Sequence, residues 1–293
     1  MRIHHLDCGP MRPPGGALID GVSAGPFGRL TCHCLAIETD HDGLVLVDTG
    51  LGLRDMVRPW PRLPSLNAGV LRFRFDPDRS ALRQIKRLGF SPRDVRHIVM
   101  THLDFDHAGG LIDFPHARVH LMEAEAVAAK RRRNLLDRVR YRPAQWGDTS
   151  RWHTYPDRAG GRWFGFDAVV QLDNLPPEIL LVPLPGHTPG HAGVAIEGPR
   201  GWVLHAGDTY FNRAEVHPAP HGVKVPPLGA LAYERLMAWN PTLARANRAR
   251  VRELVASREA SMAVFCTHDP VEYVAMTVWS ARDPSPLERE RAA

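Results

Sequence analysis

Lysine is nearly absent from this sequence of 293 residues, although basic residues are abundant. Only three lysines, Lys86, Lys130 and Lys224, stand among the 37 basic residues, so arginine supplies almost all of the positive charge. The arginines are spread along the chain and form no basic stripe interleaved with aromatic residues. The net charge of +5 therefore predicts no nucleic-acid partner. The densest basic run, residues 130–142, fits either a solvated helix face or contact with a polyanion.

Long apolar runs and cysteines are also scarce. The sequence has no apolar run of about 18 residues and no N-terminal segment typical of a signal peptide, so we expect no membrane association and a cytoplasmic protein. Its four cysteines form no CxxC pair and are too few for a disulfide framework. We expect buried, reduced thiols, with Cys266 in the core. An apolar share of 44% excludes a disordered chain and predicts a sizeable core.

Strands and helices alternate along the chain, which is typical of a layered α/β fold. Apolar patterns predict strands at residues 30–39, 43–48, 97–100, 119–122, 179–183, 192–196, 202–205 and 262–266. Helices are predicted at residues 78–88, 123 to about 140, and 241 to about 257. We expect loops at residues 54–77 and at the aromatic-rich residues 141–167, and a frayed tail from about residue 280 to 293. No linker divides the chain, so we expect one domain, residues 1–293.

A cluster of ligand-type side chains follows the predicted strand at residues 97–100. His102, Asp104, Asp106 and His107 lie within six residues and precede two glycines that allow a tight turn. Imidazole and carboxylate groups in such a loop can converge on a metal ion. A polar loop whose aspartates cap turns is the alternative for this segment taken alone.

Three later residues favour the metal interpretation. His187 lies in a turn rich in glycine and proline after the strand at residues 179–183. Asp208 and His268 each follow a predicted strand directly. Layered α/β folds place their chemistry on loops at strand ends, so the whole set predicts a metal centre.

These segments, from Asp48-Thr49-Gly50 to His268, resemble the metallo-β-lactamase superfamily of metal-dependent hydrolases. The resemblance implies an α/β fold, a four-layer αββα sandwich with a binuclear metal site at one edge. It also implies that Asp48 supports the ligands from behind. His205, just before the Asp208 turn, has either such a supporting role or a place in the core. The implied ligands are His102, Asp104 and His187 for the first metal, Asp106, His107 and His268 for the second, and Asp208 as the bridge.

Position 104 departs from the common family pattern, which has histidine there. An acidic residue at this position is seen in some relatives with a di-iron centre. Two divalent ions would be neutralised by Asp104, Asp106, Asp208 and a bridging hydroxide, so the core should be a weaker Lewis acid. We expect two divalent ions, zinc foremost, with iron or manganese favoured at the site with Asp104. The alternative is that Asp104 does not bind and one metal is held.

The resemblance implies hydrolysis by a metal-bridging hydroxide, with Asp106 or Asp208 passing a proton to the leaving group. Residues 141–146, 162–166 and 177–191 are similar to the acyl-homoserine lactonase branch. That branch has a tyrosine three residues after the bridging aspartate, where Phe211 stands here, so Tyr210 is the catalytic candidate in its place. The expected substrate-binding residues, which could instead be core, are Phe105, Trp146, Trp163 and Phe164.

The sequence therefore predicts a hydrolase that acts on a small molecule, a lactone or carboxylic ester, and that could form a homodimer. A glyoxalase II-like thioesterase is the alternative, since the arginines at 245, 248, 250 and 252 could bind glutathione. A nuclease or phosphodiesterase of the same fold is less favoured. An oxygen-reducing flavodiiron role would need a flavin domain, for which the chain has no room.

Overall fold

The computed structural model describes residues 1–157, 160–217, 225–258 and 262–281. Its strands are β1 (Arg2–Asp7), β2 (His33–Glu38), β3 (Leu44–Val47), β4 (Val95–Val99), β5 (Arg118–Met122), β6 (Trp152–Tyr155), β7 (Gly161–Trp163), β8 (Phe166–Gln171), β9 (Ile179–Pro183), β10 (Ala192–Gly198), β11 (Gly201–His205) and β12 (Met262–Phe265). Its α-helices are α1 (Ala17–Asp20), α2 (Leu53–Val57), α3 (Ser65–Leu71), α4 (Ala81–Arg87), α5 (Glu123–Arg131), α6 (Leu135–Arg140), α7 (Pro143–Trp146), α8 (Leu228–Met237), α9 (Pro241–Arg258) and α10 (Pro270–Ser280).

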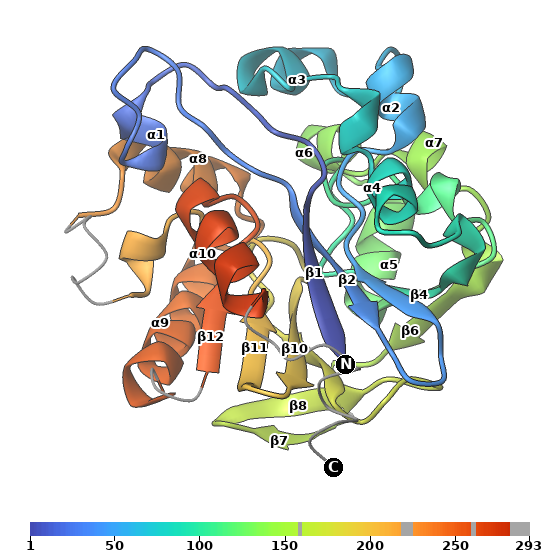
Figure 1. The fold of residues 1–293 in the computed structure, drawn as a ribbon. Coiled ribbons are helices and arrows are strands. Elements are labelled where there is room, and N and C mark those ends of the chain that lie inside the picture. The colour runs from blue at the N-terminus through green and yellow to red at the C-terminus, as the bar shows by residue number, and fades with distance from the viewer. Residues whose placement is uncertain (158–159, 218–224, 259–261, 282–293) are drawn as a thin grey trace.

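Two mixed sheets form the centre of the fold (Figure 1). The first has the order β1-β2-β3-β4-β5-β6, and the second has the order β12-β11-β10-β9-β8-β7. Strands β3 to β6 run parallel to one another, and so do β11 and β12, while the other pairings are antiparallel. Because β4 and β5 are parallel to β3, helical connections such as α4 must return the chain across the sheet.

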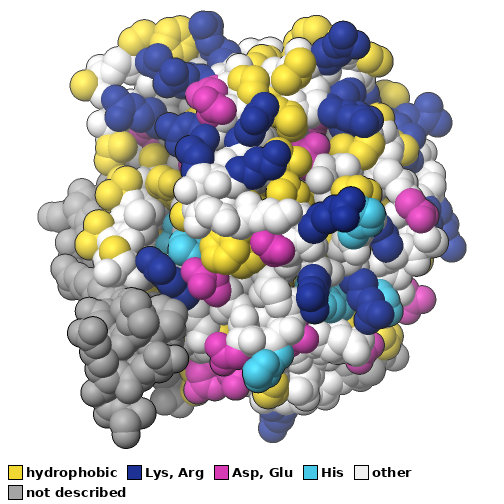
Figure 2. Space-filling model, turned by 45° about the vertical axis from the view of Figure 1, so that its right-hand side comes forward, with side chains coloured by type: hydrophobic (Ala, Val, Ile, Leu, Met, Phe, Trp, Pro, Cys, Tyr) yellow, Lys and Arg dark blue, Asp and Glu magenta, His cyan; other side chains and the backbone are white. Residues whose placement is uncertain are grey.

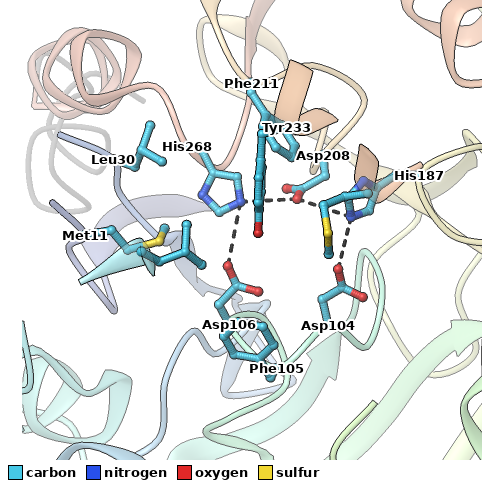
Figure 3. Close-up of a pocket in the computed structure, with 12 residues that line it drawn as sticks. Met11, Leu30, Asp104, Phe105, Asp106, His187, Asp208, Phe211, Tyr233 and His268 are labelled. Atoms are coloured by element: carbon cyan, nitrogen blue, oxygen red, sulfur yellow. Dashed lines mark hydrogen bonds and ion pairs between the residues drawn. The ribbon is translucent and has the colours of Figure 1, made fainter. Parts of the chain in front are cut away.

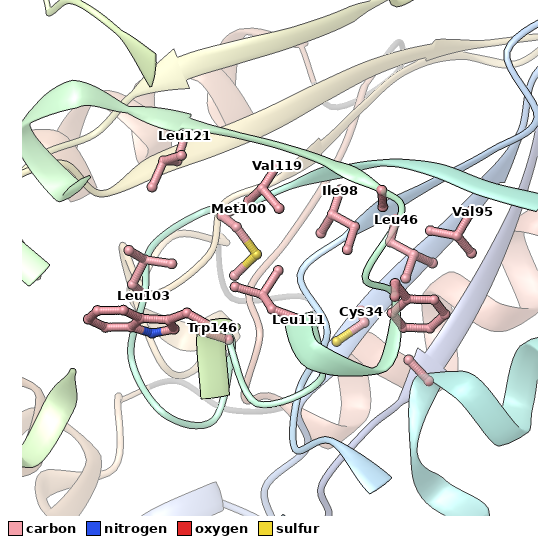
Figure 4. Close-up of a cluster of buried hydrophobic side chains, with 14 of the residues drawn as sticks. Cys34, Leu46, Val95, Ile98, Met100, Leu103, Leu111, Val119, Leu121 and Trp146 are labelled. Carbon is pink, nitrogen blue, oxygen red and sulfur yellow. The ribbon is translucent and has the colours of Figure 1, made fainter. Parts of the chain in front are cut away.

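Alternation along the strands divides the core into layers. In β2, Cys34 and Ala36 face the helices α4 and α5, whereas Leu35 and Ile37 face the second sheet. The outer cluster on the first sheet is shown in Figure 4. On the far side of the second sheet, α9 packs with residues such as Val251. The expected four-layer αββα sandwich is therefore confirmed, with α4 and α5 on one side and α9 on the other (Figure 1).

Several segments differ from the sequence expectations. The expected helix from residue 123 to about 140 is broken, because Arg132 adopts a left-handed φ of 43° and the side chain of Asn134 caps a new helix, α6. The expected loop at 54–77 contains α2 and α3, and the expected loop at 141–167 contains α7, β6 and β7. Neither α8 nor α10 was predicted. Helix α10 reaches Ser280, and residues 282–293 of the expected tail lie outside the described residues.

The dispersed basic side chains and the buried, free cysteines agree with what the composition predicts. On the face shown in Figure 2, Lys and Arg side chains are dispersed among other types. All four cysteines are buried and free, as expected. Within the described part of the chain, no helix has both the length and the apolar character needed to cross a membrane.

Buried histidines should make the fold sensitive to acid. Burial, together with the nearby His97, His153 and Arg118, lowers the pKa of His120 to about 3. Its ring nitrogens lie 2.9 Å from His97 Nδ1 and 2.8 Å from the Tyr155 hydroxyl. The fold therefore requires neutral His120. Its contribution to stability is complete above the ordinary histidine pKa of about 6.5 and is lost as the pH falls from there toward 3.

The substitution His120→Gln should accordingly reduce the acid sensitivity. Between pH 6.5 and 4.5, the free energy of unfolding of the wild type should fall by about 2 kcal/mol more than that of His120→Gln. Urea denaturation in the presence of a chelator, followed by circular dichroism, measures this difference. The exposed His41 gives the control His41→Gln, which should behave as the wild type. An equal loss of stability in all three proteins would contradict the assignment.

Candidate metal centre

The seven predicted ligand side chains converge at one edge of the two sheets, although they span residues 102 to 268. Each lies in a loop just beyond a strand: four after β4, and one each after β9, β11 and β12. All are buried, with Asp106 the most exposed at 8%. Figure 3 shows Asp104, Asp106, His187, Asp208 and His268 directed toward a common space.

One group of ligand atoms lies at distances close to those between ligands of a single metal ion. Asp104 Oδ2 lies 3.6 Å from His102 Nε2 and 3.1 Å from His187 Nε2. Asp208 Oδ2 lies 3.9 Å from His102 Nε2 and 3.5 Å from His187 Nε2. Four atoms bonded tetrahedrally to one ion at about 2.1 Å would lie roughly 3.4 Å apart. His102, Asp104 and His187 therefore form a compact group of ligand atoms, and together with Asp208 they are called the first subsite below.

A second group shares Asp208. His107 Nε2 lies 3.3 Å from Asp208 Oδ1, and His268 Nε2 lies 3.2 Å from Asp208 Oδ2. Asp106 Oδ2 is 3.9 Å from His268 Nε2. Asp106, His107 and His268 with Asp208 are called the second subsite below. Asp208 lies between the two subsites, where a bridging carboxylate would be needed.

Unpaired buried atoms provide a test of the fit to metal. Among the described residues, the atoms without a hydrogen-bond partner include His102 Nε2, His107 Nε2, Asp104 Oδ1 and Asp208 Oδ1. Buried polar atoms are rarely left unpaired in proteins. Nitrogen and carboxylate oxygen atoms in this mixture suit zinc, iron or manganese. The residues present therefore fit divalent ions.

Asp48 lies behind the second subsite. Its Oδ1 accepts a hydrogen bond from the Thr101 amide at 2.8 Å, and its Oδ2 accepts from the Thr101 hydroxyl at 2.7 Å and from His107 Nδ1 at 2.8 Å. The last contact turns His107 Nε2 toward the site. Asp48 itself has a φ of 55°, in the left-handed region, where its strand turns into the loop. His205 contacts backbone on both sides: its Nε2 lies 2.7 Å from the His33 carbonyl oxygen, and its Nδ1 accepts a hydrogen bond from the Gly207 amide at 3.1 Å, in the turn that carries Asp208.

Two further supporting residues were not predicted from the sequence. Glu125 accepts hydrogen bonds from the Leu103 amide at 2.9 Å, the Thr188 hydroxyl at 2.6 Å and the Gly190 amide at 3.1 Å. It therefore joins the loop of His102 to the loop of His187. His191 Nε2 accepts from the Asp208 amide at 2.8 Å. In the sequence, Glu125 has the pattern of an ordinary acidic residue in the first turn of a helix, so only its contacts reveal that it links the two ligand loops.

Arg140 was also missed, because the sequence places it in the basic run at residues 130–142. It is the last residue of α6 and only 2% exposed. Its Nη1 donates to Asp104 Oδ2 at 2.7 Å and lies 3.0 Å from His187 Nε2. Part of the basic run therefore enters the metal centre.

A pocket opens beside the ligands, beneath α3 and α8. Its walls are mainly apolar and include Met11, Leu30, Phe105 and Phe211. Phe105 thus lies where a substrate contact was expected. Tyr233, from α8, also lines the pocket, and Figure 3 shows its hydroxyl directed toward the carboxylates.

Four expected substrate or catalytic contacts lie elsewhere. Trp146 packs in the outer cluster of the first sheet with residues such as Leu103 (Figure 4). Trp163 and the 40% exposed Phe164 pack against Trp202 beyond the second sheet, with ring centroids 5.3 Å and 6.3 Å away. The fourth, the tyrosine at position 210, is fully buried, and its hydroxyl donates to a Glu272 oxygen at 3.0 Å. None of the four lines the pocket: Trp146, Trp163 and Tyr210 are buried in the core, whereas Phe164 lies at the surface.

The substitution Asp48→Asn should weaken metal binding. An amide in place of the carboxylate removes the charge and one acceptor that orient His107, so we expect metal affinity to fall by about 10- to 100-fold. Competition with a chromogenic chelator measures the affinity. Asp40→Asn, at an exposed turn position between β2 and β3, is the matched control and should leave the affinity unchanged. Equal affinities for the two variants would show that Asp48 does not support the centre.

Comparison with known proteins agrees with this geometry. Residues 27–253 match the family model described as the metallo-beta-lactamase superfamily. A probable metallo-hydrolase of Mycobacterium tuberculosis is 41% identical over 93% of this chain and 82% of its own length. An N-acyl homoserine lactonase of Bacillus cereus is 26% identical over 69% of this chain and 75% of its own length.

Among solved structures, an N-acyl homoserine lactone hydrolase with N-hexanoyl-L-homoserine at its catalytic metal centre superposes with a TM-score of 0.69. It is 20% identical, and the match covers 94% of this chain and 95% of that chain, so this likeness concerns the fold. The family match and the identity with the mycobacterial relative, in contrast, show a relationship in sequence. The chain therefore belongs to the metallo-β-lactamase superfamily.

Proposed function

We propose that this metallo-hydrolase cleaves a lactone or a carboxylic ester with two divalent ions. The observation that carries the proposal is the pocket, in which the carboxylate and imidazole ligands meet an apolar wall with a single phenol among its lining residues. Such a wall suits the acyl chain or ring of a small apolar ester, and the enclosed volume of about 20 Å³ must widen to admit one. The lactonase relatives support the same class of substrate.

The seven converging residues would hold the ions, three in each subsite with Asp208 shared. When bound, the ions supply an activated water and polarise the substrate carbonyl. The chain contributes a largely buried, prearranged donor set, so little reorganisation is needed before reaction. Zinc suits both subsites, and a carboxylate at position 104 also suits iron or manganese.

Asp106 is the better placed of the two candidate proton carriers. Asp208 has imidazole nitrogens of four histidines within 4.0 Å, at 3.2 to 3.9 Å. Asp106 lines the pocket and has one such contact, the 3.9 Å approach of His268 Nε2. A carboxylate that faces substrate with spare acceptor capacity can take a proton and deliver it to the leaving oxygen.

Tyr233 is placed to bind the substrate carbonyl or the leaving oxygen. Its hydroxyl faces the carboxylates across the pocket (Figure 3), so it can donate to an oxygen that sits between them. This role was expected of Tyr210, whose hydroxyl is engaged by Glu272 in the core. Tyr233 comes from α8, which has no counterpart in the predicted elements, so spacing from Asp208 gave no signal for it.

The arginine surface expected for a glutathione thioesterase is largely engaged within the protein. Arg248 contacts Glu215 and Glu234. Arg250 stacks over Phe166 at 4.5 Å, and Arg252 donates to the carbonyl of residue 215. Guanidinium groups held in this way are poorly available to a glutathione carboxylate, which favours the ester substrate over the thioester.

A turnover panel on metal-loaded protein tests the substrate class. We expect hydrolysis of lactones or carboxylic esters, and slower or no hydrolysis of thioesters and phosphodiesters. Asp208→Ala removes the shared carboxylate and should lower kcat/KM by about 1000-fold or more. Turnover of phosphodiesters alone would overturn the proposal, and unchanged activity in Asp208→Ala would exclude the mechanism.

A matched pair of tyrosine variants tests whether the hydroxyl of Tyr233, and not that of Tyr210, acts on the substrate. Tyr233→Phe should lower kcat/KM for the best substrate by about 10- to 100-fold, because one donor to the reacting oxygen is lost. Metal content should be unchanged. Tyr210→Phe should keep the activity and lose about 1 kcal/mol of stability, because a buried hydrogen bond is removed. The reverse pattern would assign the catalytic role to Tyr210.

A further inference from the structure

Arg140 places a permanent positive charge inside the proposed metal centre. The side chain is almost fully buried, and Asp104 is its ion-pair partner at 2.7 Å. Burial alone would lower the pKa of Arg140, but the Asp104 carboxylate outweighs this effect, and the guanidinium remains charged. Burial of an arginine is costly unless a carboxylate neutralises it, so the pair is a specific feature of this fold.

The contact with His187 has a chemical consequence. Arg140 Nη1 lies 3.0 Å from His187 Nε2, which is also one of the ligand atoms of the first subsite. A neutral imidazole nitrogen has one lone pair, which either accepts an N–H donor or binds a metal ion. His187 Nε2 also lies 3.1 Å from Asp104 Oδ2. In the tautomer whose Nε2 is unprotonated, the guanidinium and an ion in the first subsite compete for the same lone pair of His187.

The balance of charges at the first subsite also opposes metal binding there. Asp104 adds a negative charge to the first subsite, and Arg140 compensates that charge in the absence of metal. An ion that enters must share Asp104 with a neighbouring cation and is repelled by it. Among the described residues, the ion pairs of Asp106, His107 and His268 are to Asp48, Asp208 and one another, and they involve no arginine or lysine.

We propose that Arg140 makes the first subsite the weaker and more exchangeable of the two metal sites. In the metal-free protein its guanidinium holds Asp104 and His187 in place, and it leaves His187 when an ion binds there. Metal then loads in a fixed order, with the second subsite first. This inference rests on the binuclear centre of the proposed function but not on the identity of the substrate.

Titration of metal-free protein with Co(II), followed by its visible absorption, tests the order of loading. We expect two binding steps in the wild type that differ in affinity by about tenfold or more. His187→Ala should abolish the weaker step, and His268→Ala should abolish the tighter step. Two equal steps, or loss of the tighter step in His187→Ala, would overturn the proposal.

A pair of variants at position 140 tests the cause. Arg140→Gln removes the charge and should tighten the weaker step by about tenfold or more, with the tighter step unchanged. Arg140→Lys keeps a cation beside Asp104 and should leave the weaker step weak. A weaker step that is unchanged or weakened further in Arg140→Gln would overturn the role of Arg140. If Arg140→Gln does not fold, the order of loading in the wild type and the histidine variants still decides the proposal.

The readout also separates this inference from the proposed function. Co(II) absorption reports the ligands directly and requires no turnover. Two ordered steps without lactone or ester hydrolysis would reject the substrate class and keep the role of Arg140. Absence of any Co(II) binding would reject the metal centre and this inference together.

Discussion

Three carboxylates buried at close range are the constraint on which the centre depends. Asp104, Asp106 and Asp208 are each at most 8% exposed, and they share one space at the sheet edge. Carboxylates removed from water repel one another and must be matched by positive charge or by donors. Imidazoles, the Arg140 guanidinium and the proposed divalent ions provide this match. A buried sheet edge of this composition suits cation binding. Without a cation, it would lower the stability of the fold.

The sheets allow this concentration of charge because they hold it from several directions. The loops after β4, β9, β11 and β12 reach the same edge, and each is anchored to a strand with strongly buried neighbours. Hydrogen bonds from His268 Nδ1 to the Thr31 carbonyl and from His107 Nδ1 to Asp48 fix these two imidazole rings from behind. The apolar layers therefore stabilise the fold, and the residues at the sheet edge are available for metal binding and catalysis.

The sequence predicted the layered fold and the convergence of the ligands, because both depend on local patterns. Strand ends followed by histidine or aspartate are visible without a structure. Arg140, Glu125 and Tyr233 were not predicted, since each reaches the centre from a helix whose own pattern is ordinary. Trp146 and Trp163 were expected at the substrate because their segments are similar to the lactonase branch, with the core as the alternative, and a residue type cannot distinguish a pocket wall from a core. Contacts between segments that are distant in the sequence decide which helix residues reach the centre and which aromatic residues line the pocket or the core.

The contacts of Glu125 have a consequence for how metal is acquired. A single carboxylate ties the loop of His102 to the loop of His187 by hydrogen bonds of 2.6 to 3.1 Å, which are made between protein groups and require no ion. The conformational entropy lost in ordering these two loops is therefore paid during folding and not during metal capture. An ion meets a cage that already exists, so its affinity reports the donor atoms and their charges with little contribution from loop closure.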